Sequence, residues 1–380
     1  MDIIIINNSK KVGCAPLCPL NTCLLSTMLG AMFYAPHPLV FSQNHSYDSL
    51  LLSQYHFSLI SLYTQKSNRP QRQDFVDTMV SSSSYSIQRG RIEMPRESCW
   101  LQRLVELSFP SSRITDVRIS RGRLHSIYLL KLSNGAKLIL KMHARPQATL
   151  MRHELTSLET EAKVLSRLCS STCRFATRLI GFSRRLEAGG RSYILKEYVP
   201  GIPLSDFEAT SLTNHDRQDI EKQHGNAVRL IGEHIGSTFG TVAAVSAGRG
   251  EKLWRHAFML LLDSLLFEAE NKLISLPFRE IRRQAIRLMS ALNDVMKPRL
   301  VVLDLGSPSH IILDPSTKRI VGFTNFSNAF WADMLFSEAF ENPTSAFIEG
   351  YGFNPMQDET ARARLLLLVP LFPCRCCSFY

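Results

Sequence analysis

The chain of 380 residues contains no run of about 20 nearly uninterrupted apolar residues, the length that a transmembrane helix needs. Its apolar stretch 24–36 follows two lysines. However, Asp2 and a run of isoleucines come first, and prolines and an asparagine interrupt the region, so it lacks the order of a secretory signal. We therefore expect a soluble protein with no membrane partner.

Zinc-type cysteine spacing is also missing from the body of the chain. The one Cys-x-x-Cys spacing, Cys374 to Cys377, lies in the C-terminal tail, and no histidine follows at zinc-finger spacing, so a structural zinc site is not expected. Six cysteines lie in the two tails, which leaves Cys99, Cys169 and Cys173 in the body of the chain. Sparse body cysteines fit a reducing compartment, and the expected location is cytoplasmic.

Positive charge is in excess, with 44 Lys and Arg against 33 Asp and Glu and a net charge of +11. Such a surplus favours nucleic acid, acidic lipid or a phosphorylated small molecule as a partner, although a basic surface without special function is an equal reading. The basic residues are dispersed and no nucleic-acid-binding module is recognisable, so a nucleic-acid partner is not expected. With 45% hydrophobic residues, the composition is that of a globular protein and excludes a wholly disordered chain.

The length allows two or three structural units, but regular patterns begin only near residue 96. Residues 37–95 are rich in Ser, Gln, Asn, His and Tyr, and residues 1–95 are expected to form a weakly ordered leader. The end of the chain, 364–380, passes from a leucine run into a cysteine-rich terminus and is treated as an atypical tail. The predicted units are 96–200, rich in strands, and 201–363, mainly helical.

Alternating patterns predict strands first. Strands are expected over 115–119, 126–132 and 137–142, and Asn134-Gly135 between the last two is a strong hairpin signal because it supplies positive φ angles. A helix over 155–168 follows, and then strands over 175–185 and 191–199.

Helical periodicity dominates the second unit, over 216–245, 254–274 and 278–295. Three short strands, 300–303, 311–314 and 319–324, come after these helices. The predicted class is therefore α+β, with a small β-rich lobe before a larger helical lobe.

This order of elements is that of a bilobal kinase, and Lys141, Glu161, Asp304 and Asn325 stand in the corresponding positions. The block 300–314 (LVVLDLGSPSHIILD), followed by 320–333 (IVGFTNFSNAFWAD), resembles the aminoglycoside phosphotransferase and choline kinase-like family, of which the chain would be a divergent member. The resemblance spans roughly residues 115–351. It implies a protein-kinase-like fold, ATP and Mg²⁺ as cofactors, and a small-molecule hydroxyl as phosphate acceptor.

Phosphoryl transfer needs a cation on the nucleotide phosphates, a metal-binding group and a base near the acceptor hydroxyl. By resemblance, Lys141 would contact the α and β phosphates and Glu161 would fix it as an ion pair, while Asp304 would be the catalytic base. From local sequence alone, Lys141 and Glu161 could equally be solvated surface charges, and Asp304 could simply cap a turn.

The remaining nucleotide-binding residues follow from the same resemblance. The turn at Gly122 and Ser126 occupies the position of the nucleotide loop, although an ordinary hairpin turn explains it equally well. Glu197 and Val199 precede Pro200 at the hinge between the lobes, where the adenine would bond to main-chain groups.

Three positions depart from the family pattern. Val302 replaces a histidine that supports the loop, and Ser309 with His310 stands where an asparagine would bind metal. Asn325 replaces the metal-binding aspartate and thereby loses the negative charge that holds Mg²⁺. His310 and Asn325 would be the substitute metal ligands, and imidazole suits Mg²⁺ less well than a hard oxygen donor.

These retained and altered positions are compatible with two functions. The first is an ATP-dependent small-molecule phosphotransferase with an eroded metal site. The second is a catalytically weak or inactive pseudokinase that binds nucleotide or a partner protein. The acceptor itself is not encoded in a recognisable motif.

Overall fold

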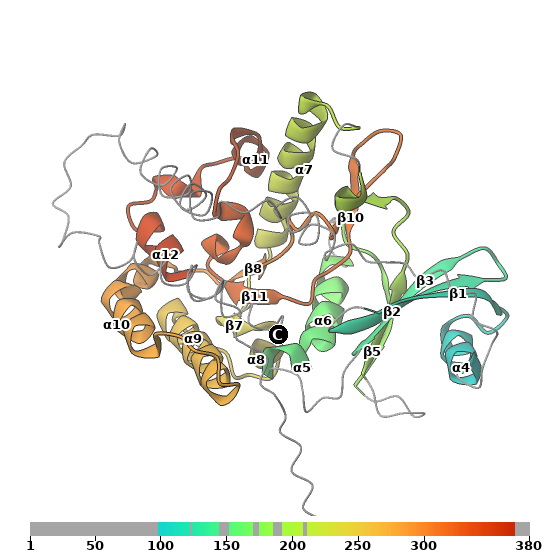
Figure 1. Cartoon of the computed structure of the whole chain (residues 1–380), viewed down its shortest axis with the longest axis horizontal. Coiled ribbons are helices and arrows are strands. Elements are labelled where there is room, and N and C mark those ends of the chain that lie inside the picture. Colours follow the sequence, from blue (N-terminus) through green and yellow to red (C-terminus); the bar gives the residue numbers. More distant parts are fainter. Residues whose placement is uncertain are drawn as a thin grey trace, which may run out of the picture.

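The computed structural model describes residues 98–121, 124–143, 152–169, 175–184, 192–207 and 211–368 (Figure 1). The predicted leader 1–95, Gly122 and residues 369–380 of the predicted tail lie outside these ranges. The predicted α+β class is confirmed, because a strand-rich part precedes a mainly helical one.

The first part is an antiparallel five-stranded sheet in the order β1-β2-β3-β5-β4. Its strands are β1 (Ile114–Arg121), β2 (His125–Leu132), β3 (Lys137–His143), β4 (Leu179–Ser183) and β5 (Tyr193–Glu197). Gly135 between β2 and β3 has a φ of 85°, which glycine adopts without strain, so the hairpin predicted from Asn134-Gly135 is confirmed.

Each face of the sheet packs against a helix. Leu138, Leu140 and Met142 alternate along β3 and form a core with α4 (Ser98–Ser108) on one face. The residues between them, including Lys141, point toward α6 (Ser157–Cys169), which follows the single turn α5 (Arg152–Leu155). Figure 1 shows α6 between the sheet and the helical part, so residues on this face lie near both.

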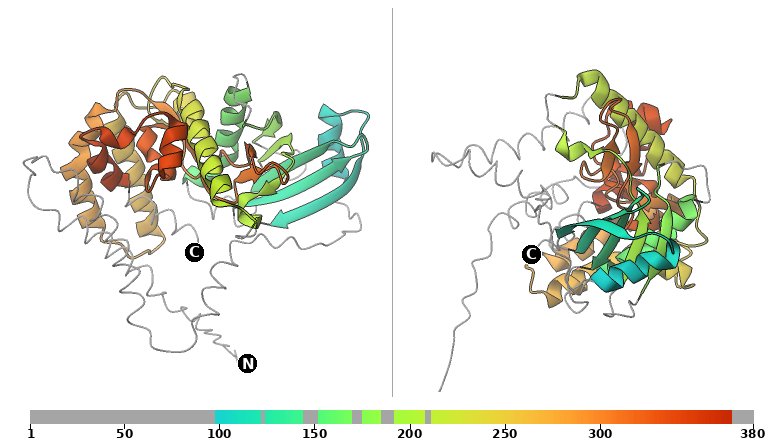
Figure 2. Two further views of the ribbon diagram at one scale, coloured as in Figure 1. Left: turned by 90° about the horizontal axis from the view of Figure 1, so that it is seen from above. Right: turned by 90° about the vertical axis from the view of Figure 1, so that its right-hand side faces the viewer.

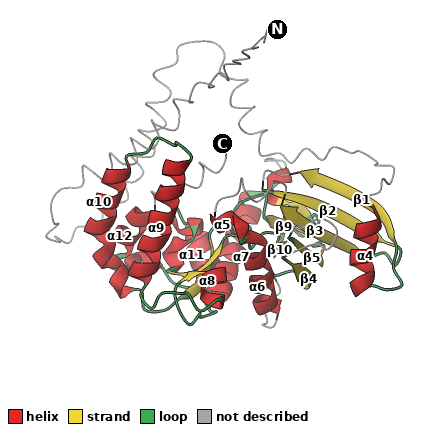
Figure 3. Cartoon of the chain, turned by 90° about the horizontal axis from the view of Figure 1, so that it is seen from below, coloured by secondary structure: helices red, strands yellow, loops and turns green. Residues whose placement is uncertain are grey.

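The second part is built on helices that stand side by side (Figures 2 and 3). The helices are α7 (Asn214–Gly232), α8 (Val242–Ser246), α9 (Trp254–Asn271), α10 (Phe278–Leu288), α11 (Ser345–Tyr351) and α12 (Ala361–Leu368). Short 3₁₀ turns lie among them: η2 (Leu204–Asp206), η3 (Met289–Asp294), η4 (Met334–Phe336), η5 (Glu338–Phe340) and η6 (Pro355–Gln357). Trp254, Phe258, Phe340 and Phe347 are almost fully buried among these elements.

Two small three-stranded sheets connect the parts. One has the order β10-β9-β6 and the other β7-β11-β8. The strands are β6 (Ile202–Pro203), β7 (Gly240–Thr241), β8 (Arg299–Val302), β9 (Ile311–Leu313), β10 (Ile320–Phe323) and β11 (Ala329–Ala332). These sheets place the loops after β8 and after β10 next to each other, because β11 pairs with β8 and β10 pairs with β9.

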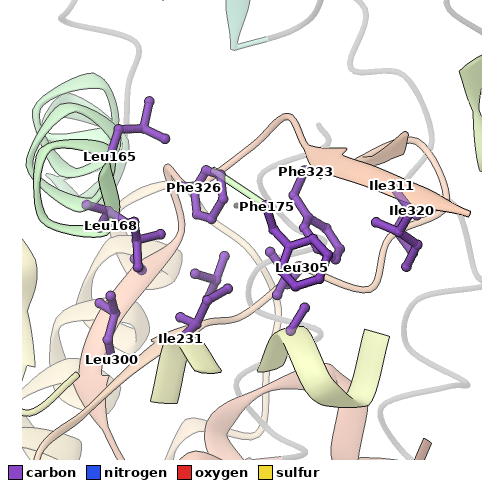
Figure 4. Packing of buried hydrophobic residues seen from close by; sticks show 14 of the residues in the cluster. Leu165, Leu168, Phe175, Ile231, Leu300, Leu305, Ile311, Ile320, Phe323 and Phe326 are labelled. Atoms are coloured by element: carbon purple, nitrogen blue, oxygen red, sulfur yellow. The ribbon is translucent and has the colours of Figure 1, made fainter. Parts of the chain in front are cut away.

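A continuous apolar core lies under those two loops (Figure 4). Leu165 and Leu168 of α6, Ile231 of α7, and Leu305 and Phe326 of the loops are among its members. Leu305 is 1% exposed and Phe326 is 0% exposed, and they directly follow Asp304 and Asn325 in the chain. Burying these neighbours fixes the backbone of both polar residues.

Several helix boundaries in the structure differ from the predicted ones. The helix predicted over 216–245 is wrong, because α7 ends at Gly232 and the chain then forms β7 and the separate helix α8. The helix predicted over 278–295 ends at Leu288 and continues as the 3₁₀ turn η3. Helix α12 (Ala361–Leu368) spans the boundary predicted between residues 363 and 364.

None of the helices in the described ranges is long and apolar enough to cross a membrane. Within the same ranges, Cys99 and Cys169 are free and exposed. The cytoplasmic location stays a prediction.

Candidate functional site

Lys141 and Glu161 form a buried ion pair between the sheet and α6. The ammonium nitrogen of Lys141 on β3 lies 2.7 Å from Oε2 of Glu161, and the two residues are 6% and 0% exposed. Both face inward because Lys141 follows the strand alternation toward α6, while Glu161 lies among the buried residues of that helix. The alternative that these are solvated surface charges is wrong.

A second lysine shares the same glutamate. Lys196 on β5 donates from Nζ to Oε1 of Glu161 and, at 2.6 Å, to the carbonyl oxygen of Thr324. It is 3% exposed, so it lies behind the pair rather than in solvent. Lys196 has no place in the motifs of the sequence and was not predicted. The only sign of it in the sequence is a charged residue inside β5, directly after the apolar Leu195.

The two ammonium groups keep Glu161 ionised. Burial alone would raise the pKa of this carboxyl, but the charges of Lys141 and Lys196 outweigh that effect and lower it to about 2. Burial also lowers the pKa of Lys196, an effect that the charge of Lys141 reinforces and that of Glu161 opposes. The site therefore holds a fixed buried carboxylate with two cationic partners.

Asn325 links this ion pair to the loop after β8. Its Oδ1 accepts hydrogen bonds from Lys141 at 3.0 Å and from the hydroxyl of Ser327 at 2.7 Å, and its Nδ2 donates to Oδ2 of Asp304 at 3.2 Å. These partners fix the orientation of the amide, because the oxygen faces donors and the nitrogen faces a carboxylate. Residues from distant parts of the chain are thus joined in one hydrogen-bonded cluster.

Asp304 lies at the centre of this cluster. Its Oδ2 also accepts a hydrogen bond from Asn328 at 2.8 Å, while its Oδ1 is buried and has no hydrogen-bond partner among the described residues. Asn328 is a second residue that sequence reasoning missed. It reaches Asp304 because β11 pairs with β8, so that Leu303 bonds to the carbonyl oxygen of Asn328.

Close packing with α7 holds the loop after Asp304. A Cβ atom on Gly306 would lie 2.6 Å from the imidazole of His224, so only glycine allows this approach. His224 is 6% exposed, and burial lowers its pKa to about 4, which keeps it neutral at ordinary pH. The loop therefore rests on an uncharged ring.

His310, rather than Ser309, comes next to Asn325. Its Nδ1 lies 3.0 Å from the carbonyl oxygen of Asp304, and its Nε2 lies 3.5 Å from Nδ2 of Asn325. The β9–β10 pairing produces this arrangement, because the amide of Thr324 bonds to the carbonyl oxygen of His310. The hydroxyl of Ser309 is 3.1 Å from that of Ser307 instead.

The other predicted nucleotide residues do not join the cluster through their side chains. Ser126 pairs with Met142, so its side chain lies on the α4 face of the sheet, away from Lys141. The carboxylate of Glu197 pairs with exposed Arg178 at 2.8 Å, and its carbonyl oxygen accepts from Thr177. Val199 is half-buried, with its side chain near Gly322. Main-chain contacts at these positions stay predictions.

Asp333 forms a buried ion pair in the helical part and does not join the cluster around Asp304 through its side chain. It caps η4 through the amide of Leu335 and accepts from Arg364 at 2.9 Å in a buried ion pair. Burial raises the pKa of Asp333, against the opposing charge of Arg364. This pair ties α12 to the helical part.

The residues at the predicted metal positions do not fit Mg²⁺. The oxygen of Asn325 already accepts from Lys141 and Ser327, and His310 offers nitrogen where Mg²⁺ prefers oxygen. Among the described residues, no group of three or more His, Cys, Asp or Glu side chains could hold a metal ion.

No family model matches the chain, and no curated protein matches it. Solved structures do match. One is a thermostable mutant of aminoglycoside phosphotransferase APH(4)-Ia in a ternary complex with AMP-PNP and hygromycin B, with 14% identity, 70% of this chain and 87% of that chain covered, and a TM-score of 0.48. Another is the macrolide 2′-phosphotransferase MphH from Brachybacterium faecium, with 15% identity, coverage of 75% and 94%, and a TM-score of 0.48.

A third match is the streptomycin–ATP–APH(2″)-IIa ternary complex, with 14% identity, coverage of 71% and 86%, and a TM-score of 0.46. The likeness is distant, and it does not establish what this chain acts on.

Proposed function

We propose that this protein is an ATP-dependent phosphotransferase that acts on the hydroxyl of a small molecule. One observation carries the proposal: Glu161, Lys141, Asn325 and Asp304 form an unbroken chain of hydrogen bonds. This chain brings a buried cation from the sheet next to a carboxylate from the helical part, and these supply two of the groups that phosphoryl transfer needs: a cation for the phosphates and a base for the acceptor hydroxyl.

Lys141 neutralises the phosphates in this proposal. An ammonium group beside the phosphates stabilises the charge that builds up on them during transfer. Glu161 holds Lys141 in place, and Lys196 holds Glu161 from behind, so the pair stays oriented when Lys141 turns toward an anion. Lys196 is thus a positioning residue.

Asp304 is the proposed base. It takes the proton of the acceptor hydroxyl, the hydroxyl oxygen forms a bond to the γ-phosphorus, and the bond from that phosphorus to the β-phosphate oxygen breaks to release ADP. Asn325 and Asn328 both donate to Oδ2 and thereby fix the carboxylate. Oδ1 accepts no hydrogen bond from the described residues, and it is the oxygen proposed to take the proton.

A second function has a specific observation in its favour. The amide at Asn325 lacks the negative charge of a metal-binding carboxylate, and its oxygen is filled by hydrogen bonds within the protein. Nucleotide binding without transfer, as in a pseudokinase, is therefore the second candidate.

The test is transfer of labelled γ-phosphate from ATP to a panel of hydroxylated small molecules, comparing the wild-type chain with Asp304→Asn. We expect the substitution to lower transfer by about a hundredfold or more, because a general base contributes at least that much, while nucleotide affinity is retained. The matched control is Asp219→Asn, which makes the same change at an exposed position of α7.

Transfer by Asp304→Asn at the wild-type rate would contradict the role of Asp304. Nucleotide binding with no transfer to any acceptor favours the second candidate.

A further inference from the structure

We infer that the site takes the polyphosphate of its nucleotide as a metal-free anion, with the charge of Lys141 in the place of a divalent cation. This inference rests on the proposed nucleotide binding and concerns how that binding is achieved. Three features of the cluster around Asn325 support it.

The first feature is the filled oxygen of Asn325. A carbonyl oxygen has two lone pairs, and three donors approach this one: Lys141 at 3.0 Å, the Ser327 hydroxyl at 2.7 Å and the Ser327 amide at 3.3 Å. No lone pair is left for a metal ion. A cation bound at this oxygen would also lie against the ammonium group of Lys141 and be repelled by it.

The second feature is the orientation of His310. A carbonyl oxygen only accepts, so Nδ1 of His310 carries the hydrogen that it shares with the carbonyl of Asp304. The lone pair is then on Nε2, which faces the amide nitrogen of Asn325. Both side chains at the predicted metal positions are thus satisfied by each other and by the protein.

The third feature is the balance of charge. Lys141 and Lys196 are balanced by Glu161 and Asp304, and the side chain at 325 is neutral. An aspartate at 325 would leave an excess negative charge, which is what attracts a divalent cation to a nucleotide site. With an amide there, Lys141 is available to a polyphosphate without competition from a carboxylate at 325.

The experiment measures the affinity of the full-length chain for ATP by calorimetric titration, once in EDTA and once in excess Mg²⁺. We expect the two dissociation constants to agree within about threefold. A difference of tenfold would correspond to about 1.4 kcal/mol of binding free energy. The variant Asn325→Asp restores the carboxylate. We expect it to bind at least about tenfold more weakly in EDTA, and Mg²⁺ to recover most of that loss.

The control is Asn354→Asp, which adds the same charge at an exposed position whose side chain caps η6, a role that aspartate also fills. We expect it to bind like the wild type in both conditions. Circular dichroism of each variant separates a folding defect from a binding defect. The comparison of wild-type binding in EDTA and in Mg²⁺ does not depend on any variant.

Wild-type binding that requires Mg²⁺ would overturn the inference and leave the proposed nucleotide binding intact. Absence of binding in both conditions would overturn the proposed function, and the inference with it.

Discussion

Glu161 is the residue on which the geometry of the site depends. Its two carboxylate oxygens each face a different lysine, and all three side chains are almost fully buried. Removing one member of a buried ionic group is costly, because it leaves an uncompensated charge away from water. The triad of Lys141, Glu161 and Lys196 therefore couples β3, β5 and α6.

The triad makes stability depend on pH. Because the folded-state pKa of Glu161, about 2, lies below its ordinary value of 4.5, its contribution is fully present above pH 4.5 and is lost as the pH falls toward 2. The wild type should be more stable than Glu161→Gln at pH 6. We expect this difference in the free energy of unfolding to be smaller by about 2 kcal/mol at pH 3. Urea unfolding at both values measures this.

The control for that measurement is Glu341→Gln, the same change at an exposed glutamate. A difference between wild type and Glu161→Gln that is the same at both pH values would show that Glu161 is not held ionised.

Most residues of the cluster could be predicted from the sequence, and others could not. Lys141, Glu161, Asp304 and Asn325 were found because each has a fixed place in an ordered series of motifs. Lys196 and Asn328 have no such place. They join the cluster only because β5 pairs with β3 and β11 pairs with β8. The sequence of one strand does not show which strand it pairs with.

At the scale of elements, α7 and α11 cross in close contact. A Cβ atom on Gly225 would lie 2.1 Å from the carbonyl oxygen of Phe347, and one on Gly350 would lie 1.9 Å from that of Lys222. Neither obstacle is a flexible side chain. The two helices therefore touch backbone to backbone, and α7 in turn carries His224, on which Gly306 rests.

This contact predicts a large effect of one methyl group. Gly225→Ala should lower the free energy of unfolding by about 3 kcal/mol, because the backbone of α11 has to move away. Gly232→Ala is the matched control on the same helix, since nothing lies within 4 Å of its added Cβ atom. It should be neutral or stabilise by up to about 1 kcal/mol. Urea unfolding compares the two variants, and equal effects would contradict the close crossing.

The sequence predicted element types better than element ends. The segment 216–245 keeps a helical spacing of apolar residues, but the chain leaves the helix after Gly232. Two glycines explain the break. Gly236 lies against the ring of Trp331, where a Cβ atom would be 2.7 Å from the ring, and Gly240 has a φ of 134°, which no helix contains. Contacts with residues almost 100 positions away are not visible in local periodicity.

At the scale of the whole molecule, the site joins the two parts of the chain. Lys141 and Glu161 come from the sheet and α6, while Asp304 and Asn325 come from loops of the small sheets above the core of Figure 4. At the C-terminal end of the described residues, the buried ion pair of Arg364 with Asp333 ties α12 to the rest of the helical part. Helix α12 therefore crosses the predicted boundary at 363 without a break, and the division of the chain into units stays a prediction.

A nucleotide bound at this junction should stabilise the whole chain, since a ligand that binds only the folded state adds RT ln(1 + [L]/Kd) to its stability. At a hundredfold excess over Kd this amounts to about 2.7 kcal/mol. The effect should depend on Lys141 and not on exposed lysines of the sheet such as Lys131.

The most direct test is thermal unfolding with millimolar ATP and Mg²⁺ for three proteins: wild type, Lys141→Met and the control Lys131→Met, at an exposed position of β2. We expect ATP to raise the midpoint of wild type and Lys131→Met by several degrees and to leave that of Lys141→Met unchanged. An equal rise in Lys141→Met, or no rise in the wild type, would contradict a nucleotide site at Lys141.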